Sequence, residues 1–295
     1  MRSLRVATRG SALARWQADR VAALLGGDAV EMVIVDTIGD RDKSTSLDQL
    51  GGQGIFVKEV QAALLDGRAD IAVHSAKDLP SSPDLTPAGL VLAAVPERAD
   101  PRDVLVGASL AELGPGATVA TGSARRRAQL ADLRPDLTFT DLRGNVPTRV
   151  ERVPPGGAIV TAMAALDRLG LTDRAAEALD ASTFVPQVAQ GALAVECRAD
   201  DHEARAALAA IEDGDARRCV DAERAWLAAI GGGCDLPVGA HAVVAHGVLR
   251  LTGLLASHDG RIVLRHTFEG DDPIELGHRL ATHLLDHGGR WLLDG

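Results

Sequence analysis

Residues 69–80 read ADIAVHSAKDLP, an apolar run that passes directly into a polar turn closed by a proline. We predict a buried strand over residues 70–73 and a loop over residues 74–80, which places Ser75, Lys77 and Asp78 just after the strand. Ligands of α/β proteins bind at the loops that follow the carboxyl ends of strands. The stretch therefore indicates an α/β fold with a polar site at one edge of its sheet.

On both sides of this stretch the chain alternates between strand-like and helix-like segments. Towards the amino terminus, the pattern predicts strands over residues 4–7 and 30–35 and helices over residues 12–25 and 55–65. A second series has strands over residues 103–106, 118–120, 137–140 and 158–161, with helices that start near Ser123, Val146 and Ala162. Such alternation is typical of α/β domains with parallel or mixed sheets.

Two breaks in this alternation predict three domains. Residues 95–102 and 184–187 are typical of crossings between domains, and residues 188–196 return to the first. We expect an α/β domain of residues 1–95 with 188–212 and a second of residues 96–187. The remaining residues, 213–295, are expected to form a small α+β domain from helices over 215–229 and 273–285 and strands over 240–244, 248–254 and 262–267.

The composition indicates a folded protein and argues against a nucleic-acid partner. Of the 295 residues, 46% are hydrophobic and 24% are charged, which is typical of globular domains. The formal net charge is -10, aromatic residues make up 2%, and there is no tyrosine. Nucleic-acid binders need a broad basic face or aromatic stacking platforms, and this composition offers neither.

We expect a cytoplasmic protein without a membrane segment or a metal site. The amino terminus lacks the apolar stretch of a secretory signal, and no apolar run is long enough to span a bilayer. The three cysteines have no C-x-x-C spacing, and the nine histidines are scattered apart from one H-x-x-x-H pair, His283 and His287, so we expect neither disulfides nor a metal site. No long apolar surface helix demands a partner, so a monomer is expected.

Residues 230–239, IGGGCDLPVG, place one cysteine in a glycine-rich loop. A cysteine that only fills space usually lies in an apolar strand or helix, whereas glycines let a bulky group approach the backbone closely. The pattern fits a Cys234 thiol that something large reaches or permanently occupies. Cys197 and Cys219 lie in apolar or amphipathic patterns and are expected to be structural.

Basic charge is concentrated between residues 121 and 152. This stretch holds seven arginines and four acidic residues, a net charge of +3 within a protein of -10. Arginine suits bidentate recognition of carboxylate or phosphate, so arginines at strand-to-helix junctions indicate a polyanionic ligand. The arginines at such junctions are Arg9, Arg125, Arg126, Arg143 and Arg149, whereas a solvated helix face is the simpler interpretation for Arg127, Arg134 and Arg152.

Together these motifs resemble the porphobilinogen deaminase family, whose members are also called hydroxymethylbilane synthases. The combination of His-Ser-x-Lys-Asp, Leu-Arg-Gly-Asn and Gly-Gly-Cys is far more specific than any one motif. The matching segments span almost the whole chain in order: residues 4–11, 51–59, 69–80, 121–126, 142–149, 190–192, 196–198 and 232–234. The resemblance implies two periplasmic-binding-protein-like α/β domains with mixed sheets and a small α+β carboxyl-terminal domain.

The resemblance also implies an activity. The family joins four porphobilinogen molecules head to tail, releasing ammonia each time, on a dipyrromethane primer attached to a cysteine by a thioether. It then releases the linear tetrapyrrole by hydrolysis. By this resemblance Cys234 is the attachment point and Asp78 the catalytic carboxylate. The residues expected to bind cofactor and substrate are Arg9, Ser11, Gln17, Ser75, Lys77, Thr121, Ser123, Arg125, Arg126, Arg143, Arg149, Arg168 and Gln190.

Three positions depart from the usual family pattern. Gln53 stands where a lysine is frequent, Gly122 where a serine is common, and Ala165 where a glycine is common. On the residues alone, two other functions stay open: a passive binding protein for a small organic anion, built from the same α/β halves, and a nucleic-acid binder that uses the arginines. The missing export signal and the Cys234 loop argue against the first, and the net charge argues against the second.

Overall fold

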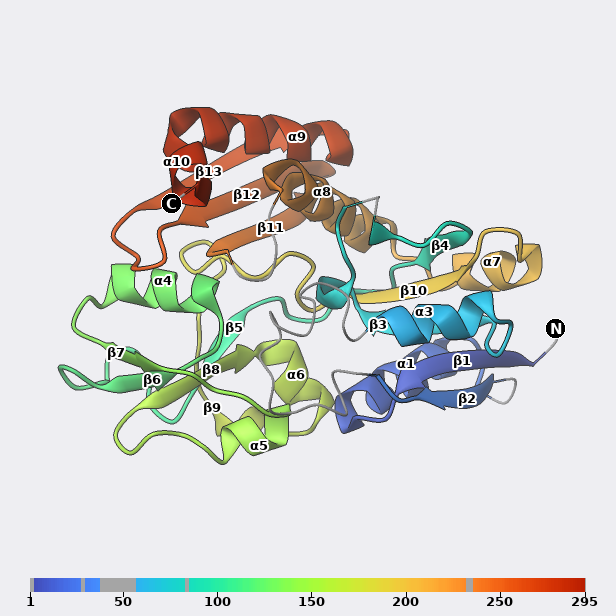
Figure 1. The fold of residues 1–295 in the computed structure, drawn as a ribbon, viewed down its shortest axis with the longest axis horizontal. Helices are drawn as coiled ribbons and strands as arrows, with labels where there is room; N and C mark the ends of the chain where they lie inside the picture. The colour runs from blue at the N-terminus through green and yellow to red at the C-terminus, as the bar shows by residue number, and fades with distance from the viewer. Residues whose placement is uncertain (1–2, 28–29, 38–56, 83–84, 232–235, 295) are drawn as a thin grey trace. The chain divides into compact units, whose positions relative to one another are not determined.

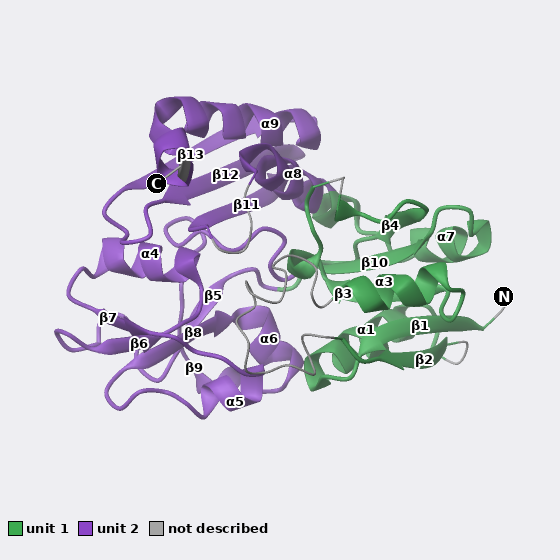
Figure 2. Ribbon diagram, viewed as in Figure 1, with its two compact units in different colours: residues 1–99, 192–217 green, residues 100–191, 218–295 purple. Residues whose placement is uncertain are grey.

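The computed structural model describes residues 3–27, 30–37, 57–82, 85–231 and 236–294 (Figure 1). The chain divides into two compact units (Figure 2). Unit 1 consists of Met1–Ala99 and Ala192–Arg217, and unit 2 of Asp100–Gly191 and Arg218–Gly295. The division into three domains that the sequence suggests stays a prediction.

Unit 1 holds a five-stranded mixed sheet of order β2-β1-β3-β10-β4. β1 is parallel to β2 and β3, whereas β10 is antiparallel to β3 and β4. The strands are β1 (Leu4–Arg9), β2 (Val30–Val35), β3 (Ile71–Ser75), β4 (Leu90–Ala94) and β10 (Leu193–Arg198). The helices are α1 (Ala12–Leu24), α3 (Lys58–Leu65), α7 (His202–Ala209) and the single 3₁₀ turn η1 (Ala76–Asp78).

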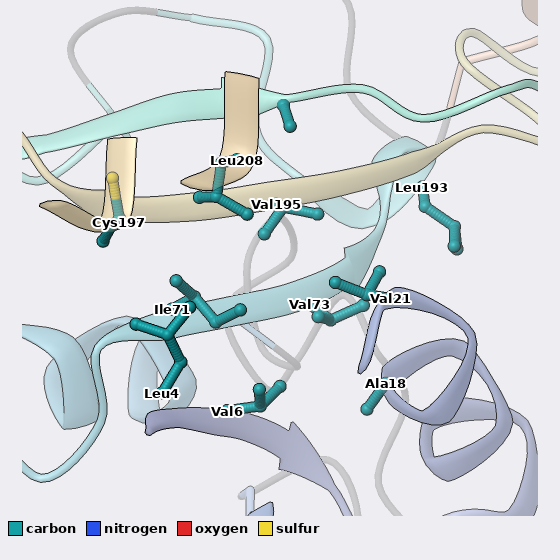
Figure 3. Close-up of a cluster of buried hydrophobic side chains, with 12 residues drawn as sticks. Leu4, Val6, Ala18, Val21, Ile71, Val73, Leu193, Val195, Cys197 and Leu208 are labelled. Carbon is teal, nitrogen blue, oxygen red and sulfur yellow. The ribbon is translucent and has the colours of Figure 1, made fainter. Parts of the chain in front are cut away.

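Successive side chains of a strand point to opposite faces of the sheet, so this sheet has one hydrophobic core on each face. One face packs Val6 and Val73 against Val21 of α1 and Leu208 of α7 (Figure 3). The other face packs residues such as Ala7, Ala72 and Val35 against α3. Both faces of the sheet are covered, so we look for a ligand site at the end of the sheet where the parallel strands terminate.

Unit 2 contains a second mixed sheet, of order β7-β6-β8-β5-β9. β6 is parallel to β7 and β8, and β5 is antiparallel to β8 and β9. The strands are β5 (Asp103–Val106), β6 (Thr118–Ala120), β7 (Thr138–Thr140), β8 (Ala158–Ala162) and β9 (Ala175–Ala178). The helices are α4 (Ala124–Leu133), α5 (Val146–Val150), α6 (Met163–Arg168) and η3 (Thr172–Arg174).

Both sheets therefore follow one plan, in which three parallel strands are followed by an antiparallel strand and then by an edge strand. In unit 1 the inserted strand is β10, and in unit 2 it is β5. α4 covers one face of the second sheet through Leu130, and α5 and α6 cover the other through Val150 and Leu166.

The carboxyl-terminal part of unit 2 is an antiparallel sheet, β11-β12-β13, with helices packed on it. Its strands are β11 (Val238–Ala245), β12 (Val248–Ala256) and β13 (Val263–Gly270). Its helices are α8 (Gly214–Ile230), which begins in unit 1, α9 (Pro273–Leu284), the π-helical turn η4 (Leu285–Gly289) and α10 (Arg290–Asp294). A Cβ on Gly253 would lie 2.7 Å from Trp226 of α8 and 3.1 Å from Leu280 of α9, so both helices pack closely on β12.

The fold class expected from the sequence is confirmed: two mixed α/β sheets are followed by a small α+β region. The sequence interpretation missed the edge strands β4 and β9, the strand β10 and the short helices α7 and α10. The predicted helix over residues 55–65 begins at Lys58, with Val57 as its N-cap, and residues 55 and 56 lie outside the described chain. Across the described ranges, no helix combines the length and apolarity that a bilayer crossing requires.

Candidate active site

In unit 1 the predicted site residues gather where two neighbouring parallel strands end. Arg9 is the last residue of β1 and Ser75 the last of β3, and these strands pair side by side (Figure 1). The chain turns directly from Ser75 into η1, whose second and third residues are Lys77 and Asp78. The topology therefore brings a guanidinium, an ammonium and a carboxylate to the same edge of the sheet.

Hydrogen bonds fix the residues around this turn. Gln17 of α1 donates from Nε2 to Ser75 Oγ at 2.8 Å, which joins two predicted site residues. The Ala76 amide donates to the Ala192 carbonyl of the segment leading into β10 at 3.0 Å. Ser11 caps α1 by accepting the Ala14 amide at 3.3 Å, so its hydroxyl serves the helix end.

The two charged residues of the turn are half-buried between buried neighbours. Lys77 and Asp78 are both partly accessible, whereas Ala76 and Leu79 on either side are buried. The apolar residues anchor the turn while the carboxylate stays within reach of a ligand. A fixed and accessible carboxylate can hold a developing positive charge or transfer a proton.

In unit 2 the predicted residues again follow the carboxyl ends of parallel strands. Thr121, Ser123, Arg125 and Arg126 come after β6, Arg143 and Arg149 after β7, and Arg168 at the end of α6 after β8. Because β5 runs the opposite way, its first residue, Asp103, pairs with Ala162 at the end of β8. The topology thus places one carboxylate at the edge that carries the arginines.

Arg125 and Arg126 share this carboxylate in a buried cluster. Arg125 Nη1 donates to Asp103 Oδ2 at 2.7 Å, and Arg126 donates from Nε and Nη2 to Oδ1 at 2.9 and 2.7 Å. The three residues are 3%, 7% and 0% exposed, so water screens these interactions little. Burial works to raise the pKa of Asp103, but the two cations outweigh it and hold that pKa well below the usual range.

Two neutral predicted residues support the cluster, and one caps a helix. Gln190 Nε2 donates to Asp103 Oδ1 at 3.0 Å and to the Pro101 carbonyl at 2.8 Å. Thr121 is buried and its Oγ1 accepts the Ser123 amide at 3.2 Å. Ser123 caps α4 by accepting the Arg126 amide at 3.4 Å. These side chains set the backbone from which the arginines project.

The remaining three arginines differ in burial. Arg143 is exposed, whereas Arg149 is half-buried and donates from Nε to the Gly144 carbonyl at 2.7 Å. Burial and the nearby charge of Arg126 lower the pKa of Arg149. Arg168 is buried and donates from Nη2 to the Gly191 carbonyl at 2.6 Å, and burial lowers its pKa to about 10 against an opposing effect of Asp167.

The other positions singled out in the sequence are two residues outside the described chain, two departures from the family pattern and two cysteines. Cys234 and Gln53 lie in segments that are not described. Gly122 is exposed, and a Cβ there would lie 3.3 Å from the Leu142 carbonyl, so the local space is narrow for a serine. Ala165 is buried in α6. Cys197 and Cys219 are buried as expected of structural cysteines, and burial raises the pKa of Cys197 to about 11.

Four carboxylates are buried in the described part of the chain, and sequence reasoning gave none of them a role: Asp70, Asp103, Glu196 and Glu223. Besides Asp103, Glu196 on β10 lies 3.1 Å from His74 Nε2 and accepts Gln61 Nε2 at 3.0 Å. Glu223 on α8 accepts the Ala189 amide at 2.6 Å and the Ala242 amide at 2.7 Å. A charged residue within an apolar strand was the available signal for Asp103 and Glu196, because such residues are buried only when paired. Glu223 gave no comparable signal on its helix.

These features define a class: an enzyme that acts on a small polyanion, with a carboxylate turn in one α/β unit and a buried arginine cluster in the other. Residues 4–206 match the family model described as the porphobilinogen deaminase dipyromethane cofactor binding domain, and residues 217–286 match its C-terminal domain. The chain belongs to the porphobilinogen deaminase family.

Individual relatives agree over their full length. The porphobilinogen deaminase of Syntrophus aciditrophicus is 43% identical, with 99% of this chain and 98% of the relative covered. That of a Roseiflexus species is 46% identical, with 99% of both covered. Among solved structures, an arginine-specific periplasmic binding protein of Salmonella typhimurium aligns with 72% of this chain and 92% of its own. Its identity is 14% and the TM-score is 0.37, so the likeness is weak.

The arginine cluster fits the cofactor that the family model names. Arg125 and Arg126 share a single carboxylate, and Arg149 and Arg168 lie on the same sheet edge, so the edge keeps a net positive charge. The pKa of Arg149 is lowered partly by the charge of Arg126, a repulsion that an anion would relieve. A dipyrromethane carries carboxylate side chains, which guanidinium groups bind well. Within the described residues, no three His, Cys, Asp or Glu side chains are placed to hold a metal ion.

Proposed function

We propose that this chain is a hydroxymethylbilane synthase, which joins four porphobilinogen molecules into a linear tetrapyrrole in porphyrin biosynthesis. Family membership over almost the whole chain supports this proposal. The structural observation that carries it is the Asp78 turn directly after β3, at a sheet edge that also holds Arg9 and Lys77. This arrangement offers an accessible carboxylate beside cations, as a reaction on an acidic, cation-forming substrate requires.

Each addition replaces one bond by another and releases ammonia. The carbon–nitrogen bond of the porphobilinogen aminomethyl group breaks, that carbon bonds to a pyrrole carbon of the acceptor, and the acceptor carbon loses its proton. The Asp78 carboxylate stabilises the cationic pyrrole that forms when ammonia leaves, and it assists proton transfer at the reacting carbon. Water finally cleaves the completed tetrapyrrole from the acceptor.

The arginines bind the acetate and propionate groups that every pyrrole unit carries. In unit 2 we assign this role to Arg125, Arg126, Arg143, Arg149 and Arg168, and in unit 1 to Arg9 with Lys77. Ser11, Gln17, Ser75, Thr121, Ser123 and Gln190 complete the proposed set, either as donors or as supports of the backbone. Buried guanidinium groups bind carboxylates more strongly than solvated ones, because water competes less.

Cys234 is the proposed attachment point of the dipyrromethane. When bound, this cofactor supplies a tethered pyrrole carbon as the first acceptor. Tethering keeps the growing chain on the enzyme, so once a porphobilinogen molecule is bound, its addition takes place within one complex and with both reactants already positioned. We further propose a monomeric, cytoplasmic enzyme that associates with neither nucleic acid nor membrane.

The test of this function is an intact-protein mass spectrum together with an ammonia assay. The purified chain should be heavier than its sequence by one dipyrromethane, and it should release ammonia from porphobilinogen. Cys234→Ser should abolish the added mass, whereas Cys219→Ser should keep it. A chain that binds porphobilinogen but releases no ammonia would be a passive binding protein, and the proposal would be wrong.

A further inference from the structure

We propose that Asp103 is a positioning residue for primer and substrate binding, and that Gln190 acts through it. Asp103 contacts neither ligand in this proposal. Instead its two oxygens hold Arg125 and Arg126 in a fixed arrangement that leaves further N–H groups for ligand carboxylates. The inference rests on the proposed function and deepens it, since it assigns a residue that decides how the arginines can bind.

The bonding pattern of Asp103 uses both oxygens in different directions. Oδ2 accepts Arg125 Nη1, while Oδ1 accepts Arg126 Nε and Nη2 and the Gln190 amide. A guanidinium has five N–H groups in a rigid plane. Arg126 donates two of its N–H groups to Asp103 and a third, from Nη1, to the Val160 carbonyl at 3.0 Å. The plane of Arg126 is thereby fixed, with donor capacity left over.

Arg125 is held from several sides. Its Nη1 also donates to the Val185 carbonyl at 2.7 Å. Val185 is itself held by Gln129, which accepts the Val185 amide at 2.7 Å and donates to the Val185 carbonyl at 3.0 Å. A Cβ on Gly239 of β11 would lie 2.9 Å from Arg125 Cδ, so the carboxyl-terminal sheet closes against the side chain. Arg125 therefore has little freedom to take another rotamer.

The charge of Asp103 keeps two buried cations side by side. Burial lowers the pKa of Arg125, Asp103 opposes this effect, and the charge of Arg126 adds to it. Without the carboxylate, the two guanidinium groups would repel each other in a medium of low dielectric constant. Asp103 therefore makes a preorganised binding site possible, whose geometry does not have to form when the ligand arrives.

Gln190 takes its role from the same geometry. Its amide nitrogen donates to Asp103 and to the Pro101 carbonyl, at the two ends of the short segment that leads into β5. It is fully buried and follows Ala189, which has a positive φ of 58°. The side chain thus orients Asp103, so its loss should move the arginines indirectly and less severely than loss of Asp103 itself.

The experiment compares Asp103→Asn and Gln190→Met with the control Asp136→Asn, which breaks the exposed Arg134–Asp136 pair on the same unit. For each protein, intact mass gives the primed fraction, and KM and kcat for porphobilinogen are measured on the primed material. We expect Asp103→Asn to lower the primed fraction and to raise KM on the order of 10- to 100-fold. Gln190→Met should raise KM about two- to tenfold with kcat retained, and the control should match the wild type.

Each outcome is decisive. An Asp103→Asn protein that folds with wild-type priming and KM overturns the inference. If that variant fails to fold, Gln190→Met decides, because a wild-type KM, or a loss confined to kcat, would indicate a merely structural network. A wild-type chain that carries no primer or releases no ammonia would refute the proposed function instead, before either variant is compared.

Discussion

The two sheets share one pattern of parallel and antiparallel strands but bring opposite charge arrangements to their corresponding edges. In unit 1 the edge after β3 presents Asp78 half-buried on a single helical turn. In unit 2 the edge after β6 buries Arg125 and Arg126 around the fully buried Asp103. The first arrangement keeps a carboxylate accessible, and the second uses a carboxylate to hold cations still.

If the proposed roles hold, this difference means that burial of the charges, and not sheet topology, distinguishes the catalytic edge from the binding edge. An accessible carboxylate can meet a reacting atom, whereas a buried carboxylate that accepts four hydrogen bonds cannot. Buried guanidinium groups lose little entropy when a ligand arrives because their rotamers are already set. We therefore expect variants of the first edge to change turnover and variants of the second to change binding and stability.

The largest effect should follow Asp78→Asn. The isosteric amide keeps the shape of the turn but cannot hold a positive charge or accept a proton, so kcat should fall about 10²- to 10⁴-fold. Steady-state kinetics should show this loss, while intact mass should show the dipyrromethane still attached. Normal turnover of this variant would show that Asp78 has no part in the mechanism. Loss of the cofactor would show that Asp78 acts in cofactor binding, as the arginines of unit 2 are proposed to do.

Asp103→Asn should have the largest effect on stability, and the effect should depend on pH. Removing the charge leaves two buried cations unpaired, at a cost of about 3–5 kcal/mol at neutral pH. The pKa of Asp103 is lowered in the folded state, so its stabilisation is complete above its unfolded pKa of about 3.9 and is lost as pH falls toward the folded value.

Urea unfolding of the two proteins checks this prediction at several pH values. The difference in unfolding free energy should be constant between neutral pH and mildly acidic pH. Below the unfolded pKa it should shrink, because the wild type loses what the variant already lacks. A difference that stays constant into the acid range would show that folding does not lower the pKa of Asp103.

Arg149→Gln should weaken binding to an intermediate degree. This half-buried arginine lies near Arg126, and its removal relieves repulsion while deleting a donor for carboxylates. We expect a rise in KM on the order of 10- to 100-fold with a smaller change in kcat. Arg174→Gln, which breaks an exposed ion pair with Glu151 on the same unit, serves as the control. A pure kcat effect would place Arg149 with the chemistry of the first edge.

Gln17→Ala should have the smallest effect. The variant loses a neutral hydrogen bond to Ser75 Oγ, which is worth about 0.5–1.5 kcal/mol, so turnover should fall about two- to tenfold. Kinetics of Ser75→Ala and of the double variant form a mutant cycle that isolates this bond. Strictly additive losses would mean that the two side chains act separately at the edge.

Much of the fold could be predicted because local hydrophobic patterns indicate where its strands and helices lie. The strands β2, β5 and β6 have the predicted bounds, and α1 differs from its prediction by one residue. β9 escaped because its sequence, AAEA, shows neither apolar alternation nor β-branched residues. α7 carried a usable signal that was overlooked, an Asp201 side chain that caps its first turn.

From the sequence, the candidate site could be proposed as a set of residues, but its hydrogen-bond network could not. Strand-to-helix junctions pointed to Arg125 and Arg126, because each junction is a local feature of the sequence. Their partner lies 22 and 23 residues away on an antiparallel strand, and no spacing rule reveals that pairing. The same limit explains why Glu196 and His74, on neighbouring strands β10 and β3, were not connected.

The inserted strand β10 has a consequence for the order in which the protein can be made. β4 pairs with β10, and these strands lie about a hundred residues apart in the chain, with the whole second sheet encoded between them. On a ribosome, β3 and β4 therefore emerge long before the strand that joins them. Unit 1 must wait, with one edge of β3 open to solvent or to a chaperone, until nearly two thirds of the polypeptide has been synthesised.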